Sequence, residues 1–234
     1  MVELELDSDD LVIDESRYPP ALAVLVAAVL YATLPRAYVS GTSTSILGAG
    51  RFVLPALEIL LLIPLVLTAP RKVSRLHVVE RLWRRRAAIV LIGLISLANA
   101  ASIVLLVHLI ITGHKTNGHE LFRAAINIWL TNVIVFALWF WLLDEGGPVR
   151  RRRSPGRRNH DFLFPQQENP EIGQEDWQPR FVDYLYVSYT NAAAFSPTDV
   201  MPLTQWAKLL MMIESAASLL TLLMVAARAV NILS

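Results

Sequence analysis

Five long apolar stretches constrain the fold of this chain more than any other feature of its sequence. Each reaches or exceeds the roughly 17 residues that an α-helix needs to cross the hydrocarbon core of a bilayer. Apolar residues make up 54% of the chain, and most charged residues gather in blocks between these stretches. The sequence therefore predicts an all-α integral membrane protein with five transmembrane helices, at about residues 20–40, 52–68, 87–112, 121–143 and 203–233.

Composition argues against several classes of function. The formal net charge is only +1, and the basic residues stand at the ends of apolar stretches, where membrane topology explains them better than nucleic-acid binding. The chain has no cysteine, which excludes disulfides and thiolate metal sites. No set of nucleophile, base and orienting group stands out, and neither does a phosphate-binding glycine loop or a metal-ligand cluster. We therefore expect neither an enzyme nor a bound metal or cofactor.

A short aromatic segment, 181–195, precedes the last apolar stretch. As a helix it would be at most about 22 Å long, less than the roughly 30 Å of a hydrocarbon core. It ends in the polar turn Ser196-Pro197-Thr198-Asp199. Non-helical backbone at membrane depth is tolerated only where it is buried in protein or lines a water-filled cavity. We therefore predict a re-entrant hairpin here, and we take it as the main candidate for function.

The residues that flank this turn follow a known spacing. Thr190 lies in the short helix, and Pro202, Thr204, Trp206 and Lys208 open the last apolar stretch. In this order they resemble the pore region of tetrameric potassium channels, in which a pore helix leads through a filter into the inner helix. The resemblance implies a homo-oligomer in the form of a tetramer, hairpins that meet around one axis, and monovalent cations as permeant ions.

The turn itself departs from the potassium-channel filter. Ser196 and Thr198 replace both filter glycines, and Pro197 replaces the tyrosine. Glycine allows the backbone conformations that turn filter carbonyls toward the ion, whereas proline has φ locked near −65°. We therefore predict a polar turn without potassium-type selectivity, in which Asp199 serves first as an N-cap-like acceptor for the chain that enters the last span.

Three further motifs follow one another along the chain. They are the basic linker 71–86, the segment Asp161-Phe162-Leu163-Phe164-Pro165 and the segment Asp183-Tyr184-Leu185-Tyr186. Over about residues 20–233 this order resembles an uncharacterised family of bacterial five-span membrane proteins. The resemblance implies a five-span fold in the bacterial inner membrane, and it brings no established activity.

The charged blocks divide the chain into four regions. The basic linker 71–86 has apolar residues at every third position and is predicted to lie along the membrane surface. The Arg- and Pro-rich loop is expected to be loose, with aromatic residues that pin parts of it to the membrane. The regions are an acidic mobile tail, 1–18; a four-span bundle that contains the basic linker, 19–144; the polar loop, 145–180; and the hairpin with the last span, 181–234.

The two basic connectors, 71–86 and 148–158, indicate the orientation. Cytoplasmic loops of membrane proteins carry an excess of Lys and Arg, so both connectors are predicted to be cytoplasmic. The N-terminus is then cytoplasmic as well, and the hairpin enters from the cytoplasmic side. In potassium channels, by contrast, the filter faces outward.

Ionisable residues within the apolar stretches are candidate functional groups. Glu214 falls near the middle of the last span, with Ser215, Ser218 and Thr221 close by in sequence. A charge at that depth costs on the order of 3 kcal/mol or more. Two interpretations stay open: a neutral or hydrogen-bonded Glu214 that holds helices together, or a carboxylate that lines a cavity or pathway.

Three more ionisable residues are predicted to lie at similar depth in the outer leaflet. They are Glu58, His108 and Arg123, and we expect them to compensate one another's charge. Two functions remain open for the whole chain. One is a weakly selective cation pore or permeation-related protein, and the other is a non-conducting structural or regulatory membrane protein that retains the hairpin as architecture. Membrane lipids are expected partners in both.

Overall fold

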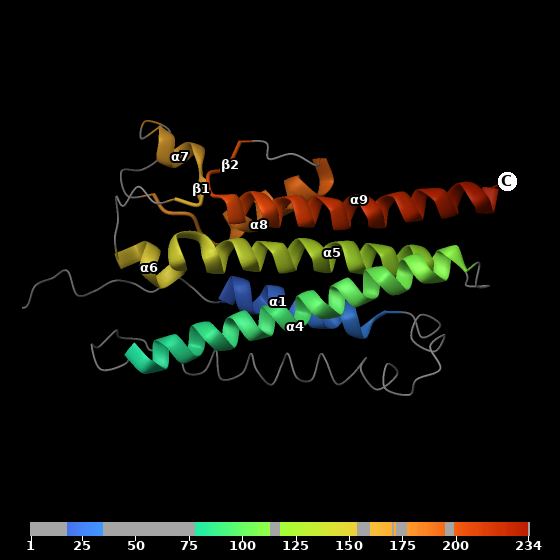
Figure 1. Ribbon diagram of the computed structural model, residues 1–234, viewed down its shortest axis with the longest axis horizontal. Coiled ribbons are helices and arrows are strands. Elements are labelled where there is room, and N and C mark those ends of the chain that lie inside the picture. Colours follow the sequence, from blue (N-terminus) through green and yellow to red (C-terminus); the bar gives the residue numbers. More distant parts are fainter. Residues whose placement is uncertain are drawn as a thin grey trace, which may run out of the picture.

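The computed structural model describes residues 18–34, 78–112, 118–153, 160–169, 171, 177–194 and 199–233. These parts are mostly helical and form one elongated bundle, which Figure 1 shows with its long axis horizontal. Several predictions concern residues outside these ranges, namely Glu58, the second span, the acidic tail and the turn residues Ser196, Pro197 and Thr198.

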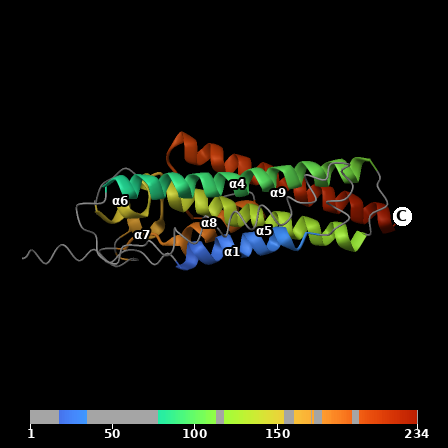
Figure 2. The same cartoon turned by 90° about the horizontal axis from the view of Figure 1, so that it is seen from below.

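Helix α5 (Gly118–Leu143) is the centre of the bundle. It contacts α1 (Tyr18–Ala32), α4 (Val78–Ile111), α8 (Phe181–Ala194) and α9 (Gln205–Leu233). Figure 1 shows α5 between α9 on one side and α1 with α4 on the other, and Figure 2 shows the same helices from below. Its buried residues lie all around the helix, as expected of a helix that is surrounded by protein.

In the part of the chain that the structure describes, three helices are long and apolar enough to cross a membrane. Helix α1 is also apolar but has only 15 residues, which is about 22 Å. The third, fourth and fifth apolar stretches are thus confirmed as helices of membrane-spanning length. The count of five spans stays a prediction, because 35–40 and 52–68 lie outside the described residues. The three long segments are Arg85–Ile111, Gly118–Gly146 and Gln205–Ala227.

One end of the bundle, which we call the basic end, carries exposed arginines. Helices α1 and α4 start there and α5 ends there. This follows from one core cluster that brings together Val24 of α1, Ile92 in the first half of α4 and Leu138 in the last turns of α5. Leu106 and Leu121 belong to a second cluster at the opposite end. The exposed arginines of the basic end in the described chain include Arg85 and Arg86 on α4, Arg150 on α6 (Pro148–Arg153) and Arg180 directly before α8.

Helix α4 corrects the prediction for the basic linker. The linker 71–86 was expected to lie amphipathically along the membrane surface, but its residues from Val78 onward are the first turns of α4, while 71–77 lie outside the described residues. This helix has 34 residues, or about 51 Å, which exceeds the roughly 30 Å of a hydrocarbon core. An α-helix continues where no residue breaks its hydrogen bonds, and 78–86 contains neither Gly nor Pro.

Helix α8 starts at the basic end with a local cap. Asp183 Oδ2 accepts a hydrogen bond from the backbone N–H of Arg180 (2.6 Å), and Asp183 N donates to Arg180 O (2.9 Å). These bonds satisfy backbone groups that a helix N-terminus leaves without intrahelical partners. The ring of Phe181 meets that of Trp141 edge to face, with 6.2 Å between the centroids. The predicted short helix is confirmed, with 14 residues.

The inner end of α8 lies partway along α9. Asn191 Nδ2 donates to Met211 O at 2.9 Å, two turns into α9. After the undescribed residues 195–198, the chain is again at the basic end, where β2 (Met201–Pro202) pairs antiparallel with β1 (Phe162–Leu163). Helix α8 therefore points inward from the basic end, and the chain comes back to that end before α9 begins.

The described parts of the polar loop are packed, which contradicts the expectation of a loose segment. Phe162 and Phe164 are buried against Tyr184 of α8, with ring centroids 6.4 Å and 5.4 Å apart. Phe162 also lies 5.0 Å from Phe140 of α5. Phe162 and Phe164 were predicted to pin the loop to the membrane, but in the structure they pack against α8 and α5. The short elements of this loop are η3 (Asp144–Gly146), α6, β1 and α7 (Pro165–Glu168).

Candidate functional site

Glu214 of α9 is completely buried against α8. Asn191 Nδ2 donates to Glu214 Oε2 at 2.7 Å, and Ser188 Oγ forms a short hydrogen bond with Glu214 Oε1. Ser188 and Asn191 are three residues apart on α8, so they lie on one face of that helix. Ser188 Oγ also contacts the backbone O of Val133 on α5 at 2.7 Å. The carboxyl group thus joins α8 to α9, and its serine partner joins α8 to α5.

A buried asparagine of α5, Asn132, extends this set of contacts. Its Nδ2 donates to Ser218 Oγ at 3.0 Å and to the backbone O of Glu214 at 3.3 Å. Its Oδ1 accepts from Asn99 Nδ2 of α4 at 3.2 Å. Four helices therefore share one layer of polar side chains within an apolar bundle. We call it the inner polar layer, and it consists of Asn99, Asn132, Ser188, Asn191, Glu214, Ser215 and Ser218.

The sequence neighbours predicted around Glu214 are only partly in this layer. Ser215 Oγ donates to Asn191 Oδ1 at 3.0 Å, and Ser218 accepts from Asn132. Thr221 instead donates to its own helix, at Ala217 O. Sequence reasoning missed Ser188, Asn191 and Asn132. The signal that could have found them is a polar side chain with hydrogen-bonding capacity in the middle of an apolar helix, because such groups seek partners on other helices.

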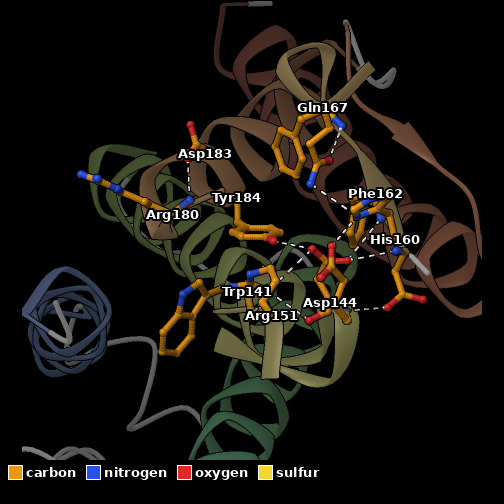
Figure 3. A network of polar contacts seen from close by, with 12 residues as sticks. Trp141, Asp144, Arg151, His160, Phe162, Gln167, Arg180, Asp183 and Tyr184 are labelled. Carbon is orange, nitrogen blue, oxygen red and sulfur yellow. Dashed lines mark hydrogen bonds and ion pairs between the residues drawn. The ribbon is translucent and has the colours of Figure 1, made fainter. Parts of the chain in front are cut away.

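A second buried carboxylate, Asp144, lies where α5 ends at the basic end (Figure 3). Its Oδ1 accepts from the backbone N–H groups of Asp161 (3.0 Å) and Phe162 (3.3 Å). Its Oδ2 accepts from the phenol of Tyr184 and lies 3.6 Å from Arg151 Nη1. Asp144 therefore collects the polar loop, α8 and α6 around the end of α5.

The buried side chain of Arg151 has three roles in this arrangement. It neutralises Asp144, and its guanidinium lies 5.0 Å from the centre of the Tyr184 ring, within range of a cation–π contact. Its Nη1 also donates to the backbone O atoms of Trp141 (3.3 Å) and Asp144 (3.0 Å). Trp141 O belongs to the last turn of α5, whose carbonyls lack partners in the helix, whereas Asp144 O follows in η3 and also accepts from Gly147 N. A cation at that helix end is also favoured by the helix dipole.

Three consecutive residues with positive φ allow the chain to turn here. They are Glu145 (φ 53°), Gly146 (φ 80°) and Gly147 (φ 102°). Gly147 N donates to Asp144 O at 2.8 Å, and a Cβ atom on Gly147 would lie 2.9 Å from Leu142 O. Only glycine fits at that position.

Asp161 links this turn to the start of α9. Its Oδ2 accepts from Glu145 N (2.9 Å), its Oδ1 accepts from Trp206 Nε1 (2.9 Å), and its backbone O accepts from Leu203 N (2.8 Å). Glu145 also forms a short contact with the imidazole of His160. We call these groups the end cluster: Asp144, Glu145, Arg151, His160, Asp161, Tyr184 and Trp206.

Tyr184 acts in the end cluster as a neutral hydrogen-bond donor. Burial raises the pKa of its phenol well above the usual value, and the nearby carboxylates act in the same direction against the opposing Arg151. The phenol therefore keeps its proton at neutral pH and donates a hydrogen bond to Asp144. Both carboxylate sites thus tie α8 to its neighbours. Asp144 does so near the start of α8, at the basic end, and Glu214 does so near its inner end.

The other predicted site residues that the structure describes lie outside the two clusters. The hydroxyl of Thr190 bonds within its own helix, to Tyr186 O (2.9 Å) or Val187 O (3.0 Å). Asp199 is exposed at the point where the described chain resumes after the turn. His108 and Arg123 are exposed near the end of the bundle opposite the basic end. Their pairing with Glu58 stays a prediction.

Within the described residues, no three or more His, Asp or Glu side chains are grouped so that they could hold a metal ion. What the two clusters offer is hydrogen bonding and charge compensation that fix α8 in place. No protein-family model, curated protein or solved structure matches this chain. Any function must therefore be argued from the arrangement of α8, α9 and the two clusters.

Proposed function

We propose that the chain is a five-span protein of the bacterial inner membrane in which α8 and the turn after it form a re-entrant hairpin. The observation that carries this proposal is the path of the chain around α8. This helix has 14 residues, too few to cross a bilayer, and the chain is at the basic end both before it and after the turn. A helix that crossed the membrane would leave the chain at the opposite end.

The basic end is the cytoplasmic side in this proposal. Arg85 and Arg86 belong to one basic connector and Arg150 to the other, and all three are exposed at the same end of the bundle. The positive-inside rule then assigns that end to the cytoplasm. The N-terminus and the entrance of the hairpin lie on the same side, opposite to the filter of the potassium channels that the hairpin resembles.

We propose further that copies of the chain assemble so that their hairpin turns meet around one axis and form a weakly selective cation pathway. Helix α9 supports this, because Leu209, Met212 and Ile213 are each more than half exposed and leave an apolar face for other copies and lipid. Ser196, Thr198 and Asp199 would then form rings of hydroxyls and carboxylates. Such rings favour cations by charge and do not replace the hydration shell as a carbonyl filter does.

The fixed position of α8 is what a pore of this kind requires. A selective constriction works only if its walls are held in place by packing and by hydrogen bonds from behind. Helix α8 is held by Asp144 through Tyr184 and by Glu214 through Ser188 and Asn191. The first partner stands directly after α5, in η3, and the second belongs to the long helix α9.

One observation favours the non-conducting alternative. Glu214 has an exposed fraction of 0%, and its two carboxyl oxygens are hydrogen-bonded to Ser188 and Asn191. It therefore lines no water-filled path within a single subunit. On this second proposal the hairpin is a structural element of a regulatory or scaffolding membrane protein.

Conductance of the purified protein in planar bilayers separates the two proposals. A pore of the proposed kind passes sodium and potassium about equally, and Asp199→Asn lowers the current because it removes the carboxylate ring. Glu168→Gln is the matched control, since Glu168 is an exposed carboxylate on α7 and is not one of the turn residues. Strong preference for potassium would contradict the predicted turn. Absence of current in reconstituted, correctly folded protein would support the non-conducting alternative.

A further inference from the structure

We infer that Glu214 is a proton-binding site: in the folded bundle it is a neutral carboxylic acid whose O–H donates to Ser188. This inference does not depend on whether the protein conducts ions. It rests on the partners of the carboxyl group, on the number of hydrogens that these partners offer, and on their lack of charge.

The hydrogens around Ser188 count in favour of a protonated Glu214. A serine hydroxyl has one hydrogen to donate and two lone pairs that accept. Ser188 Oγ lies 2.7 Å from Val133 O, which can only accept, and it also contacts Glu214 Oε1. If Ser188 donates to Val133, the hydrogen of the second contact has to come from Glu214. A protonated Glu214 then satisfies both contacts.

The other carboxyl oxygen already has a donor. Asn191 Nδ2 has two hydrogens, and its two acceptors are Glu214 Oε2 (2.7 Å) and Met211 O (2.9 Å). Asn191 Oδ1 accepts from Ser215. A neutral Glu214 therefore completes a chain of hydrogen bonds in which each donor has one acceptor. This is the arrangement expected of a satisfied buried polar network.

No partner of Glu214 in the described chain carries a charge that could balance a carboxylate. The groups that face it are Ser188 and Asn191 from α8 and the polar groups of Val133 and Asn132 from α5, followed by Asn99 of α4 behind Asn132. All are neutral. Asp144 differs, because the guanidinium of Arg151 lies 3.6 Å away. A buried carboxylate without a cation takes up a proton instead of keeping its charge.

The bound proton keeps the inner half of α8 in place. With the proton in place, Glu214 holds the inner half of α8 against α9 and, through Ser188, against α5. Removal of the proton would leave an uncompensated charge in the bundle, and the inner end of α8 would have to move to let water or a cation reach it. Above the pH at which a solvated glutamate loses its proton, the folded bundle still holds this proton and the unfolded chain does not, so the stability of the fold falls as the pH rises toward the point of release.

Infrared spectroscopy of the protein in lipid bilayers tests this inference, because protonated carboxyls and carboxylates absorb in separate regions. With isotope-labelled glutamate at neutral pH, the wild type should show a carboxylic C=O band that Glu214→Gln lacks and the control Glu168→Gln retains. Ser188→Ala should shift this band to higher frequency, since the O–H loses its acceptor. Loss of carboxylate bands alone in Glu214→Gln would overturn the inference.

A second measurement keeps the test decisive if Glu214→Gln folds poorly. In that case the labelled wild type and Ser188→Ala are compared directly, and an unshifted or absent acid band overturns the inference. Where Glu214→Gln does fold, its thermal midpoint should stay constant over the pH range in which the wild type loses stability, a range that ends where the acid band disappears. An equal fall in both proteins would assign the loss of stability to other groups and contradict the inference.

Discussion

Asp144 organises the basic end because one carboxylate meets four donors from different parts of the chain. Two are backbone amides of the polar loop, one is the Tyr184 phenol, and one is the Arg151 guanidinium. Burial of a carboxylate is costly unless hydrogen bonds and an opposite charge replace the water it loses. Asp144 has both, and these contacts offset the cost of its burial.

Replacement of Asp144 should therefore be strongly destabilising. Asp144→Asn keeps the size of the side chain but leaves the charge of Arg151 buried without its carboxylate, which should lower the free energy of unfolding by about 3 kcal/mol. The double variant Asp144→Asn, Arg151→Met should recover part of this loss, because it removes the uncompensated cation. Thermal or denaturant unfolding in detergent measures both. A loss for Asp144→Asn no larger than that for the exposed control Glu168→Gln would contradict this account.

Of the two buried carboxylates, Glu214 and Asp144, the sequence identifies only one. It singles out Glu214, which stands in the middle of an apolar stretch, but it misses Asp144, because a charge at the end of such a stretch is ordinary. The partners of both are also hidden. Asn132 and Ser188 lie 82 and 26 residues from Glu214, so only the packing of α5 and α8 on α9 brings them together.

At the scale of elements, the turn between α5 and α6 should be sensitive to the addition of a single methyl group at Gly147. Gly147 has φ 102° and ψ 168°, a region that is nearly exclusive to glycine, and a Cβ would meet Leu142 O at 2.9 Å. Gly147→Ala should therefore cost about 1–3 kcal/mol of unfolding free energy. Gly93→Ala on α4 is the control, because a Cβ there meets no described atom within 4 Å. Equal unfolding midpoints of the two variants would refute this.

Elements were predictable from the sequence to different degrees. Long apolar runs located α5 and α9 within a few residues, and the short length of α8 was read correctly from its aromatic segment. The start of α4 was not, because apolar residues at every third position suit a surface helix and the first turns of a longer helix equally well. The packing of the polar loop was missed because the sequence shows Phe162 and Phe164 as anchors but does not show that their partners are α8 and α5.

At the scale of the whole molecule, α5 is the central helix, and α8 packs against it and against α9. The two carboxylate sites fix α8 at two depths, with Tyr184 near its start and Ser188 with Asn191 toward its end. The open faces lie on α4 and α9, where Val90, Leu97 and Val104 of α4 form an exposed apolar stripe with a seven-residue spacing. Contact with lipid or with other copies suits these faces.

The orientation of the molecule can be tested with two single cysteines, because the chain has none of its own. Arg150 is exposed at the basic end and His119 is exposed at the start of α5, so the length of α5 separates them. If the basic end is cytoplasmic, a membrane-impermeant thiol reagent added to intact cells should label the cysteine of His119→Cys and leave that of Arg150→Cys unlabelled. Permeabilised cells provide the control, because both cysteines should react there. Labelling of Arg150→Cys alone in intact cells would invert the molecule, place the mouth of the hairpin outside as in potassium channels, and remove the positive-inside argument.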